Sequence, residues 1–518
     1  MKNFDKYHFR FINRGGLFPE IHRETIFSVN IYRGKEDSLS IDEVVGLRVP
    51  EELVQVFRKG TPEHDRLVHF GTEEMHCIRD AFEPDSNPDS PVLVALLDQQ
   101  TLNVIKKFTE IRERVGDLKP VVTRFFDNSY GVRDGFLKYE NRQPETPIEL
   151  ILTGPLITVG NPLFQCPRNP CVKNSDQDAI DLTSVTVDYL PRTMLSPALP
   201  LSEFRQLSEF ADTEMFLKDY PELTQDNKEE IKKLQKEELL KHFKISVRAM
   251  LNLESSRTVH ACITSPFVSH VHGLKSILFK EEQDTIMVAA EMMSLPYDYF
   301  IKSKGSTNYQ ASTILQSPLL SFSDNRQQCM AFSRVLLLNC LTAHYRNLWE
   351  RNFDASFTED SWSISDARLK AFSGLTREWT SAIPLRNDFE RRQALVEIDV
   401  LVAMAMGFTL EELCFMYRSK FRVLQQNEAD TWYDRKGRIV FTIAQSDVGV
   451  ERPLFEEYQK RAASGETEFV YTITKNQLYK GREITYYAPF NKCDRIKDYE
   501  TAWRHFEKVL GKQAPGNV

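Results

Sequence analysis

The chain has 518 residues, of which 41% are hydrophobic and 27% are charged, and its formal net charge is −8. These values are typical of a folded protein of several domains and argue against a uniformly basic coat for nucleic acid, although local basic patches are not excluded. The sequence shows no apolar run near the roughly 20 residues that cross a bilayer and no signal-peptide segment, so we expect a cytoplasmic protein with no membrane partner. The eight scattered cysteines predict reduced thiols.

Two segments near the start have the pattern of β-strands. Residues 7–12 and 27–32 are rich in aromatic and β-branched residues, and turn-forming residues 13–19 join them. An isolated two-stranded hairpin is marginally stable in water. Because nothing before this pair can extend it, we expect it to dock on a distant segment of the chain or on another polypeptide.

The next segments mix helical and strand-like patterns. Residues 39–59 predict a short helix, whereas 92–97 form a continuous apolar run that fits a buried strand or the start of the next helix. Residues 121–158 are irregular and strand-like. The proline density of residues 155–197 predicts an extended surface segment.

Helical spacing of apolar residues dominates the middle of the chain. It occurs in residues 240–251, 335–348, 395–405 and 410–421, and we interpret these stripes as core. Residues 325–425 are therefore predicted to form a helical bundle.

Strand patterns return after residue 428. A turn at 434–437 joins two predicted strands, two further strands follow, and a helix ends the pattern. The predicted strands are residues 431–433, 438–443, 469–474 and 484–487, and the helix is 499–510.

The sequence shows no recognisable cofactor, metal or catalytic motif. A phosphate or dinucleotide site needs a glycine-rich turn between a strand and a helix, and the chain has neither G-x-G-x-x-G nor G-K-[ST]. Residues 161–164 read Asn-Pro-Leu-Phe, a near miss for the Asn-Pro-Pro-aromatic loop that holds a flipped adenine. Leucine replaces the second proline, so we predict a structural turn there and assign no catalytic, cofactor or metal ligand to the chain.

Basic and aromatic residues alternate in several predicted loops. Arginine and lysine engage phosphates or guanine edges, and aromatic rings stack on unpaired bases. The alternative is a solvated turn beside a packed tryptophan. The candidate DNA-binding residues are Arg124, Arg133, Lys138, Arg168, Lys173, Arg192, Trp432, Tyr433, Arg435, Lys436 and Arg438.

Several blocks, in order over nearly the whole chain, are similar to one family. They are residues 18–32, 153–162, 188–193, 338–342, 389–395 and 428–442. The blocks resemble the large adenine-specific DNA methyltransferases of the type IIG restriction-modification kind and the PglX-like methylases of phage-defence systems such as BREX and DISARM.

The resemblance implies a target-recognition function without catalysis in this chain. In that family the cofactor loop and the Asn-Pro-Pro-aromatic motif precede the matched region, so the chain corresponds to the part after the catalytic motifs. The resemblance then implies that the chain reads double-stranded DNA while a partner chain binds S-adenosylmethionine and flips the adenine. The strand pair would complete the partner's methyltransferase sheet by strand addition, which makes the enzyme a split one.

The expected fold is α+β with several domains. They are a strand pair at 1–35, a mixed α/β DNA-recognition region at 36–200, a mainly helical domain at 201–425 and a small, basic, β-rich domain at 426–518. Two other functions stay open: a non-catalytic structural or regulatory assembly protein of a phage-defence complex, and an autonomous enzyme.

Overall fold

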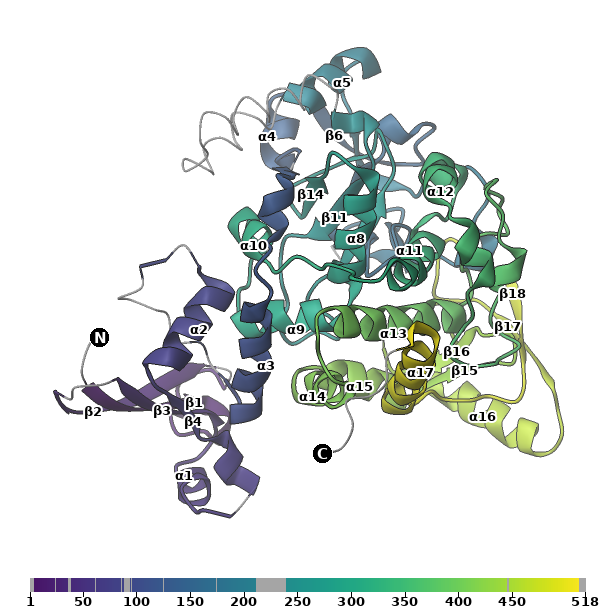
Figure 1. Ribbon diagram of the computed structural model, residues 1–518. Helices are drawn as coiled ribbons and strands as arrows, with labels where there is room; N and C mark the ends of the chain where they lie inside the picture. The colour runs from purple at the N-terminus through teal and green to yellow at the C-terminus, as the bar shows by residue number, and fades with distance from the viewer. Residues whose placement is uncertain are drawn as a thin grey trace. The chain divides into compact units, whose positions relative to one another are not determined.

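The computed structural model describes residues 4–23, 25–35, 39–60, 62–84, 86–87, 94, 96–123, 125–173, 175–210, 239–444 and 447–511 (Figure 1). Over these residues the protein is mixed α+β, with several small sheets, a helical central region and β-hairpins near residues 431–487, which confirms the predicted fold class. No described helix is both long and apolar enough to cross a membrane.

The chain divides into two compact units. Unit 1 comprises Met1–Asp117, Tyr299–Ser306 and Ser312–Leu319, and unit 2 comprises Leu118–Asp298, Thr307–Ala311 and Leu320–Val518. The finer division into four domains stays a prediction.

Unit 1 contains a four-stranded sheet in the order β2-β1-β3-β4. β1 pairs with β2 in antiparallel and with β3 in parallel orientation, and β4 is antiparallel to β3. The strands are β1 (Phe4–Ile12), β2 (Ile26–Lys35), β3 (Ser40–Leu47) and β4 (Val68–Phe70), and the helices are α1 (Glu51–Val56), α2 (Thr72–Phe82) and α3 (Gln99–Glu110).

The strand pair at the start is confirmed, but its predicted partner is wrong. The third strand, β3, comes from residues 40–47, which the sequence assigned to a helix spanning 39–59; only α1 is helical there. Val44 and Leu47 of β3 are buried and pack in one apolar cluster with Phe9 and Phe11 of β1. The pair therefore lies in a sheet made by its own chain, and β2 forms one edge of that sheet.

The largest sheet of unit 2 has the order β12-β11-β14-β5, with every neighbouring pair antiparallel. Its strands are β5 (Val121–Thr123), β11 (Lys244–Arg248), β12 (Ala261–Thr264) and β14 (Leu274–Leu278). The helix predicted over 240–251 is wrong, because this segment contains β11. Four of its five residues are buried on both faces of a central strand, and such a strand has no alternating pattern.

Three two-stranded ladders accompany this sheet, in the pairs β10-β6, β13-β7 and β8-β9. Their strands are β6 (Leu137–Arg142), β7 (Ile151–Leu152), β8 (Gln165–Pro167), β9 (Gln177–Ala179), β10 (Thr193–Pro197) and β13 (Ser269–His270). The predicted strand-like character of 121–158 is confirmed for β5, β6 and β7, whereas the helix at Asn128–Arg133 was not predicted. The extended surface segment predicted for 155–197 is wrong, because Ile157, Leu163 and Leu182 are buried in two apolar clusters.

The helical region packs in layers on the large sheet. α8 contacts β11 and β12, α11 packs against α8 and α13, and α13 contacts α17. The predicted helices at 335–348, 395–405 and 410–421 are confirmed, with a break after Asn339. The helices are α4 (Asn128–Arg133), α5 (Leu201–Phe210), α8 (Glu282–Met293), α9 (Leu295–Lys304), α10 (Ala311–Gln316), α11 (Asn325–Asn339), α12 (Arg346–Asn352), α13 (Asp388–Ala405), α14 (Leu410–Lys420), α15 (Arg422–Ala429), α16 (Arg452–Ala463) and α17 (Arg495–Leu510).

α13 is a buried helix whose polar side chains bind segments far along the chain. Buried polar groups need partners, and here each one fastens another element to the helix. The bonds are Arg391 to the Gly160 carbonyl oxygen (2.7 Å), Arg392 to Asp498 (2.7 Å), Glu397 to Arg334 (2.7 Å) and Asp399 to the Leu295 amide (2.7 Å).

Two antiparallel hairpins form the last part of unit 2. Their strands are β15 (Thr431–Tyr433) with β16 (Ile439–Thr442), and β17 (Glu468–Thr472) with β18 (Glu483–Tyr487). The predicted strands and terminal helix are confirmed. The sequence missed α16, which packs Phe455 and Tyr458 against both hairpins in one apolar core.

Candidate nucleic-acid interface

The carboxylate of Asp434 fixes the backbone of the turn between β15 and β16. Asp434 is fully buried, and its Oδ1 accepts hydrogen bonds from the backbone N–H groups of Lys436 (2.9 Å) and Arg438 (2.9 Å). Its Oδ2 accepts from the N–H of Tyr487 at 3.1 Å. Burial raises the pKa of Asp434, and these three N–H groups act against that rise. The backbone of the turn is therefore held in one conformation.

The same turn is anchored to the start of α13. The Gly437 carbonyl oxygen accepts from the N–H of Phe389 at 2.9 Å, and the Asp388 carboxylate accepts from the N–H of Ile439 at 2.8 Å. Gly437 has φ +85°, and a Cβ atom there would lie 2.6 Å from Oδ1 of Asn387. Glycine is needed both for the positive φ and for the close approach.

Two consecutive cations project from this turn beside one aromatic ring. Lys436 Nζ lies 3.6 Å from the ring centroid of Tyr487, and Cζ of Arg435 lies 6.0 Å from the same centroid. The N–H of Arg435 donates to the Tyr487 carbonyl oxygen at 2.8 Å. Both cations are exposed, and neither forms an ion pair with any residue that the structure describes.

The hairpin of β8 and β9 is bonded to the loop between β17 and β18. The Asn476 amide donates to the Ala179 carbonyl oxygen at 2.8 Å, and the N–H of Gln477 donates to Oδ1 of Asp178 at 3.1 Å. The N–H of Asn169 donates to Oε1 of Gln477 at 3.1 Å. Segments about 300 residues apart in sequence therefore form one continuous surface.

Two buried aspartates neutralise four of the arginines on this surface. Asp181 is 8% exposed and pairs with Arg438 (3.2 Å) and Arg482 (3.6 Å). Asp178 is fully buried and lies 2.8 Å from Arg168 and 3.8 Å from Arg192. Of the predicted DNA-binding residues, Arg168, Arg192 and Arg438 therefore serve first to join the β8-β9 hairpin to its neighbours.

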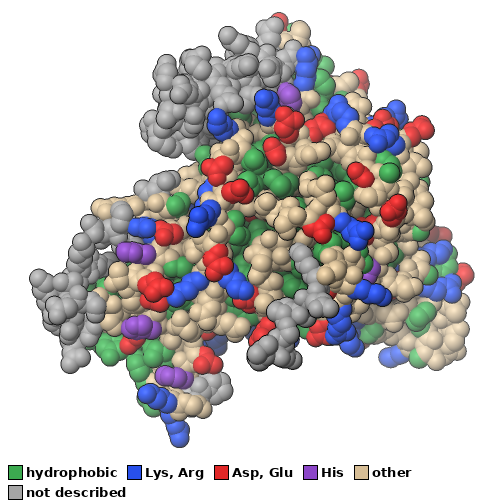
Figure 2. All heavy atoms as spheres, viewed as in Figure 1, with side chains coloured by type: hydrophobic (Ala, Val, Ile, Leu, Met, Phe, Trp, Pro, Cys, Tyr) green, Lys and Arg blue, Asp and Glu red, His purple; other side chains and the backbone are tan. Residues whose placement is uncertain are grey.

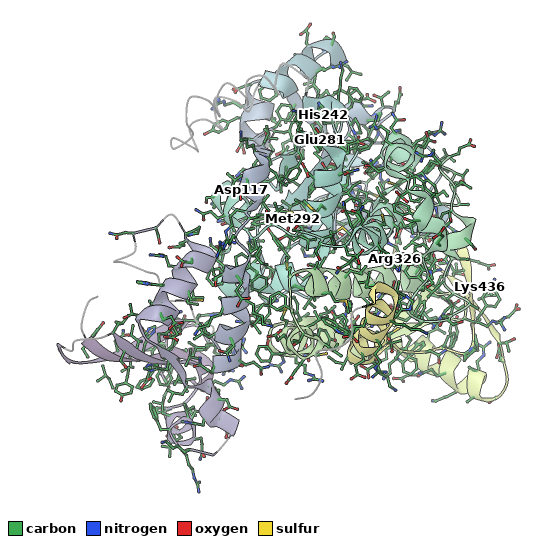
Figure 3. All side chains as sticks on the ribbon, viewed as in Figure 1. Asp117, His242, Glu281, Met292, Arg326 and Lys436 are labelled. Carbon is green, nitrogen blue, oxygen red and sulfur yellow. The ribbon has the colours of Figure 1, made fainter. Side chains whose placement is uncertain are left out.

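The exposed cations of this region define what we call the cationic surface. Its members are Lys173, Arg435, Lys436, Lys475, Lys480 and Arg482. Two of them have anionic partners, because Arg482 pairs with Asp181 and Lys475 pairs with Glu451 at 2.6 Å. Figure 3 labels Lys436, which lies beside the strands marked β17 and β18 in Figure 1. Figure 2 shows cations and carboxylates intermixed over the face in view, as the net charge of −8 leads one to expect.

The two predicted aromatic members of this cluster do not have free faces. Tyr433 is 5% exposed and packs edge-on against Phe389 with ring centroids 5.7 Å apart. Trp432 donates its indole N–H to Asp430 at 2.9 Å and packs 5.5 Å from the ring of Phe455. Tyr433 therefore has no open ring face on which a base could stack, and its assignment as a DNA-binding residue stays a prediction.

The predicted residues near α4 lie on a second surface. Arg133 pairs with Asp134 at 2.7 Å, and Lys138 of β6 pairs with Glu140 at 3.1 Å, so both cations already have an anionic partner. Arg124 lies outside the described residues. These positions are not part of the cationic surface defined above.

The aromatic rings near Arg133 and Lys138 in the sequence divide into core and exposed residues. Phe125 and Phe126 are each 2% exposed, whereas Tyr130 and Tyr139 are 55% and 62% exposed. Sequence alone does not separate these rings, because their burial depends on β11, α5 and other distant elements.

The near-miss loop at 161–164 is a structural turn, as predicted. Thr158 and Asn161 exchange two backbone hydrogen bonds of 3.0 and 3.1 Å. Oδ1 of Asn161 accepts from the N–H of Leu163 at 2.9 Å, so the amide is used within the loop.

Sequence reasoning missed Tyr487, Lys475, Lys480 and Arg482. Lys480 and Arg482 flank Gly481, and Lys475 begins the same loop between two predicted strands, which is the signal that identified residues 434–438. No local signal marks Asp178 or Asp181, because their partners lie up to 299 residues away.

Solved structures with which the chain aligns include two restriction-modification enzymes, both at low similarity. No protein-family model and no curated protein matches the chain. The type IIL restriction-modification enzyme MmeI in complex with DNA aligns with a TM-score of 0.31 and 10% identity, covering 82% of this chain and 46% of that enzyme. The type IIG restriction endonuclease BpuSI aligns with a TM-score of 0.27 and 10% identity, covering 79% and 44%. The chain thus spans less than half the length of either enzyme, and similarity at this level assigns neither a family nor a function.

Proposed function

We propose that this chain binds double-stranded DNA and recognises a target sequence in it, as the recognition part of an adenine-specific methyltransferase of a restriction-modification or phage-defence system. The resemblance of the ordered sequence blocks supports this reading. The observation that carries it is the turn at 434–437, where two exposed cations without an ion-pair partner among the described residues are held on a rigid backbone.

Salt-dependent binding of a labelled duplex, followed by fluorescence anisotropy, tests the proposal. Each phosphate that a protein neutralises changes the slope of log K against log salt by about −0.9. The double variant Arg435→Ala with Lys436→Ala should lower the steepness of that slope by about 2 and weaken binding about tenfold at moderate salt. Arg504→Ala is the matched control, because this arginine is 71% exposed but lies on α17, paired with Glu500.

Arg438 is not suitable for this test, because it bonds Asp181 and its loss would disturb the β8-β9 hairpin. Wild-type protein that shows no salt-dependent duplex binding contradicts the proposal. An equal loss of duplex affinity in the double variant and in Arg504→Ala would show that the turn is not part of the interface.

The proposal places S-adenosylmethionine and methyl transfer on a partner chain. β2 is an edge strand, and Ile26, Val29, Ile31 and Tyr32 along it are 66%, 46%, 50% and 63% exposed. An edge of this kind accepts a further strand through its backbone groups. Co-purification with a chain that binds S-adenosylmethionine supports the split enzyme; methyl transfer to DNA by this chain alone contradicts it.

The same exposed edge favours the second candidate, a non-catalytic assembly protein of a defence complex. Large apolar patches mark protein interfaces. Complex formation without any duplex binding by the chain would select this candidate over the first.

A further inference from the structure

The free edge of the unit 1 sheet lacks the sequence features that normally keep an edge strand from pairing. β2 ends the sheet, and no other described strand lies beyond it (Figure 1). Sheet edges are commonly protected by charged side chains, prolines or bulges. Residues 26–32 contain neither a proline nor a charged residue, and they pair with β1 without a register shift. This stretch of β2 is therefore a regular strand that can accept a further strand.

The hydrogen bonds to β1 fix which backbone groups of β2 point away from the sheet. The N–H of Asn13 donates to the Thr25 carbonyl oxygen at 3.0 Å, and the register continues with Ile12 opposite Ile26. Hydrogen-bonded and non-hydrogen-bonded pairs alternate in an antiparallel ladder, so the odd-numbered residues of β2 bond to β1. The residues whose N–H and carbonyl groups point outward are therefore Ile26, Ser28, Asn30 and Tyr32.

The side chains on one face of β2 match those of a second copy of the strand. A two-fold axis at Val29 makes the strand antiparallel to itself, with Val29 opposite Val29 and Phe27 opposite Ile31. Val29 and Ile31 are 46% and 50% exposed, so this pairing removes apolar surface from water. Pairs of aromatic and β-branched residues across neighbouring strands also stabilise a sheet.

The other face of β2 matches in the same register. Ser28 lies opposite Asn30, and both side chains donate and accept hydrogen bonds. Ile26 lies opposite Tyr32, and these apolar side chains are 66% and 63% exposed. The backbone groups of all four residues point outward, so these pairs are the hydrogen-bonded pairs of the new ladder. Apolar residues thus meet apolar residues and polar residues meet polar ones, without any contact between like charges in residues 26–32.

We propose that β2 pairs with β2 of a second copy of this chain, antiparallel and about a two-fold axis at Val29. The two four-stranded sheets then form one continuous sheet. Such an interface uses the same patch on both copies and closes as a dimer. The split enzyme would place its partner chain on the same edge, so self-pairing and partner binding exclude each other. The dimer does not depend on the proposed DNA binding.

Charge at the two-fold axis gives a test that is specific for this register. The mass of the purified chain, measured by light scattering after size exclusion, should be twice 60.1 kDa for the wild type. Val29→Lys and Val29→Glu each place two like charges opposite one another, so each variant alone should be monomeric. An equal mixture of the two variants should dimerise, because a lysine then faces a glutamate.

Proline at an outward-facing position gives an independent test. Asn30→Pro removes an outward N–H without breaking a bond to β1, since proline is tolerated on an edge strand, and it should be monomeric. Asn30→Ala keeps the N–H and should remain a dimer. Circular dichroism spectra that match the wild type show that each variant is folded.

Three results overturn the inference. The first is a wild type that is monomeric at about 0.1 mM, where a dimer of micromolar affinity is almost entirely formed. The second is a dimer that persists in Val29→Lys and Asn30→Pro, because it uses another surface. The third is a mixture of folded Val29→Lys and Val29→Glu that stays monomeric. Duplex binding is measured separately, so a failure of the proposed function leaves the dimer in place and is distinguishable from these results.

Discussion

Glu428 is the carboxylate on which three helices of unit 2 converge, and its neutralisation is expected to destabilise the unit strongly. Its Oε1 accepts from Arg392 (3.0 Å) and Arg495 (2.9 Å), and its Oε2 accepts from Arg495 (2.9 Å) and the Tyr417 hydroxyl (3.1 Å). The carboxylate thus joins α15, on which it lies, to α13, α14 and α17. The perturbation we consider is Glu428→Gln.

The magnitude follows from the charge balance around this group. Burial acts to raise the pKa of Glu428, but Arg495 and Arg392 outweigh it and lower the pKa from 4.5 to about 2. Each pKa unit corresponds to about 1.4 kcal/mol, so this shift represents about 3 kcal/mol of stabilisation by the ionised form. Glutamine also leaves two buried guanidinium groups short of an anion, and breaking a buried pair typically costs about 3–5 kcal/mol.

Tryptophan fluorescence during urea unfolding measures this loss in the right unit, because all five tryptophans lie in unit 2. Glu428→Gln should lower the free energy of unfolding by about 3–5 kcal/mol. Glu500→Gln is the control: Glu500 is 42% exposed and pairs with Arg504 on the surface of α17, so its loss should stay below about 1 kcal/mol.

The pH dependence has a definite direction. Because folding lowers the pKa of Glu428, its contribution is fully present above pH 4.5 and is lost as the pH falls toward about 2. Glu428→Gln should lack this acid-sensitive component. The reasoning fails if Glu428→Gln and Glu500→Gln lose the same stability, or if the acid transition of wild type persists unchanged in Glu428→Gln.

Three further substitutions test other parts of unit 2, all by urea unfolding. Burial lowers the pKa of Lys244 from 10.5 to about 7. The free energy of unfolding of the wild type should therefore rise relative to that of Lys244→Met by about 1.4 kcal/mol per pH unit above pH 7. An equal difference between the two proteins at pH 7 and at pH 9 contradicts this. Gly437→Ala should cost about 1–3 kcal/mol because of its φ of +85° and the 2.6 Å approach to Asn387, and a neutral effect would show that the turn shifts freely. Arg334→Met leaves the buried carboxylate of Glu397, 2.7 Å from the guanidinium, without its cation and should cost about 3–5 kcal/mol; a loss below 1 kcal/mol would mean that the site repacks.

The success of sequence reasoning depended on how far an apolar pattern extends along the chain. β1 and the helices at 335–348 and 395–405 follow patterns that sequence can show, and they were found. β11 is buried on both sides, and α13 carries buried arginines and carboxylates that sequence reads as a solvent face. The burial of these charged residues of α13 is explained only by their partners, such as Arg334 and Asp498, which lie far along the chain.

The residues of the candidate interface also divide into those that local sequence signals identify and those that they do not. The turn at 434–437 was found from local signals, because a basic, glycine-ending turn between strands is exposed in most folds. The roles of Arg168 and Arg438 were not found from local signals, because each pairs with a buried aspartate that the sequence places in another segment. Charge on a loop therefore identified the surface but not which cations are free to bind.

Selection from a random duplex library by the purified chain tests the central claim of target recognition most directly. We predict that the bound pool becomes enriched in one sequence that contains an adenine, and that enrichment falls when Arg435 and Lys436 are both replaced by alanine. A bound pool with the composition of the starting library would contradict the account.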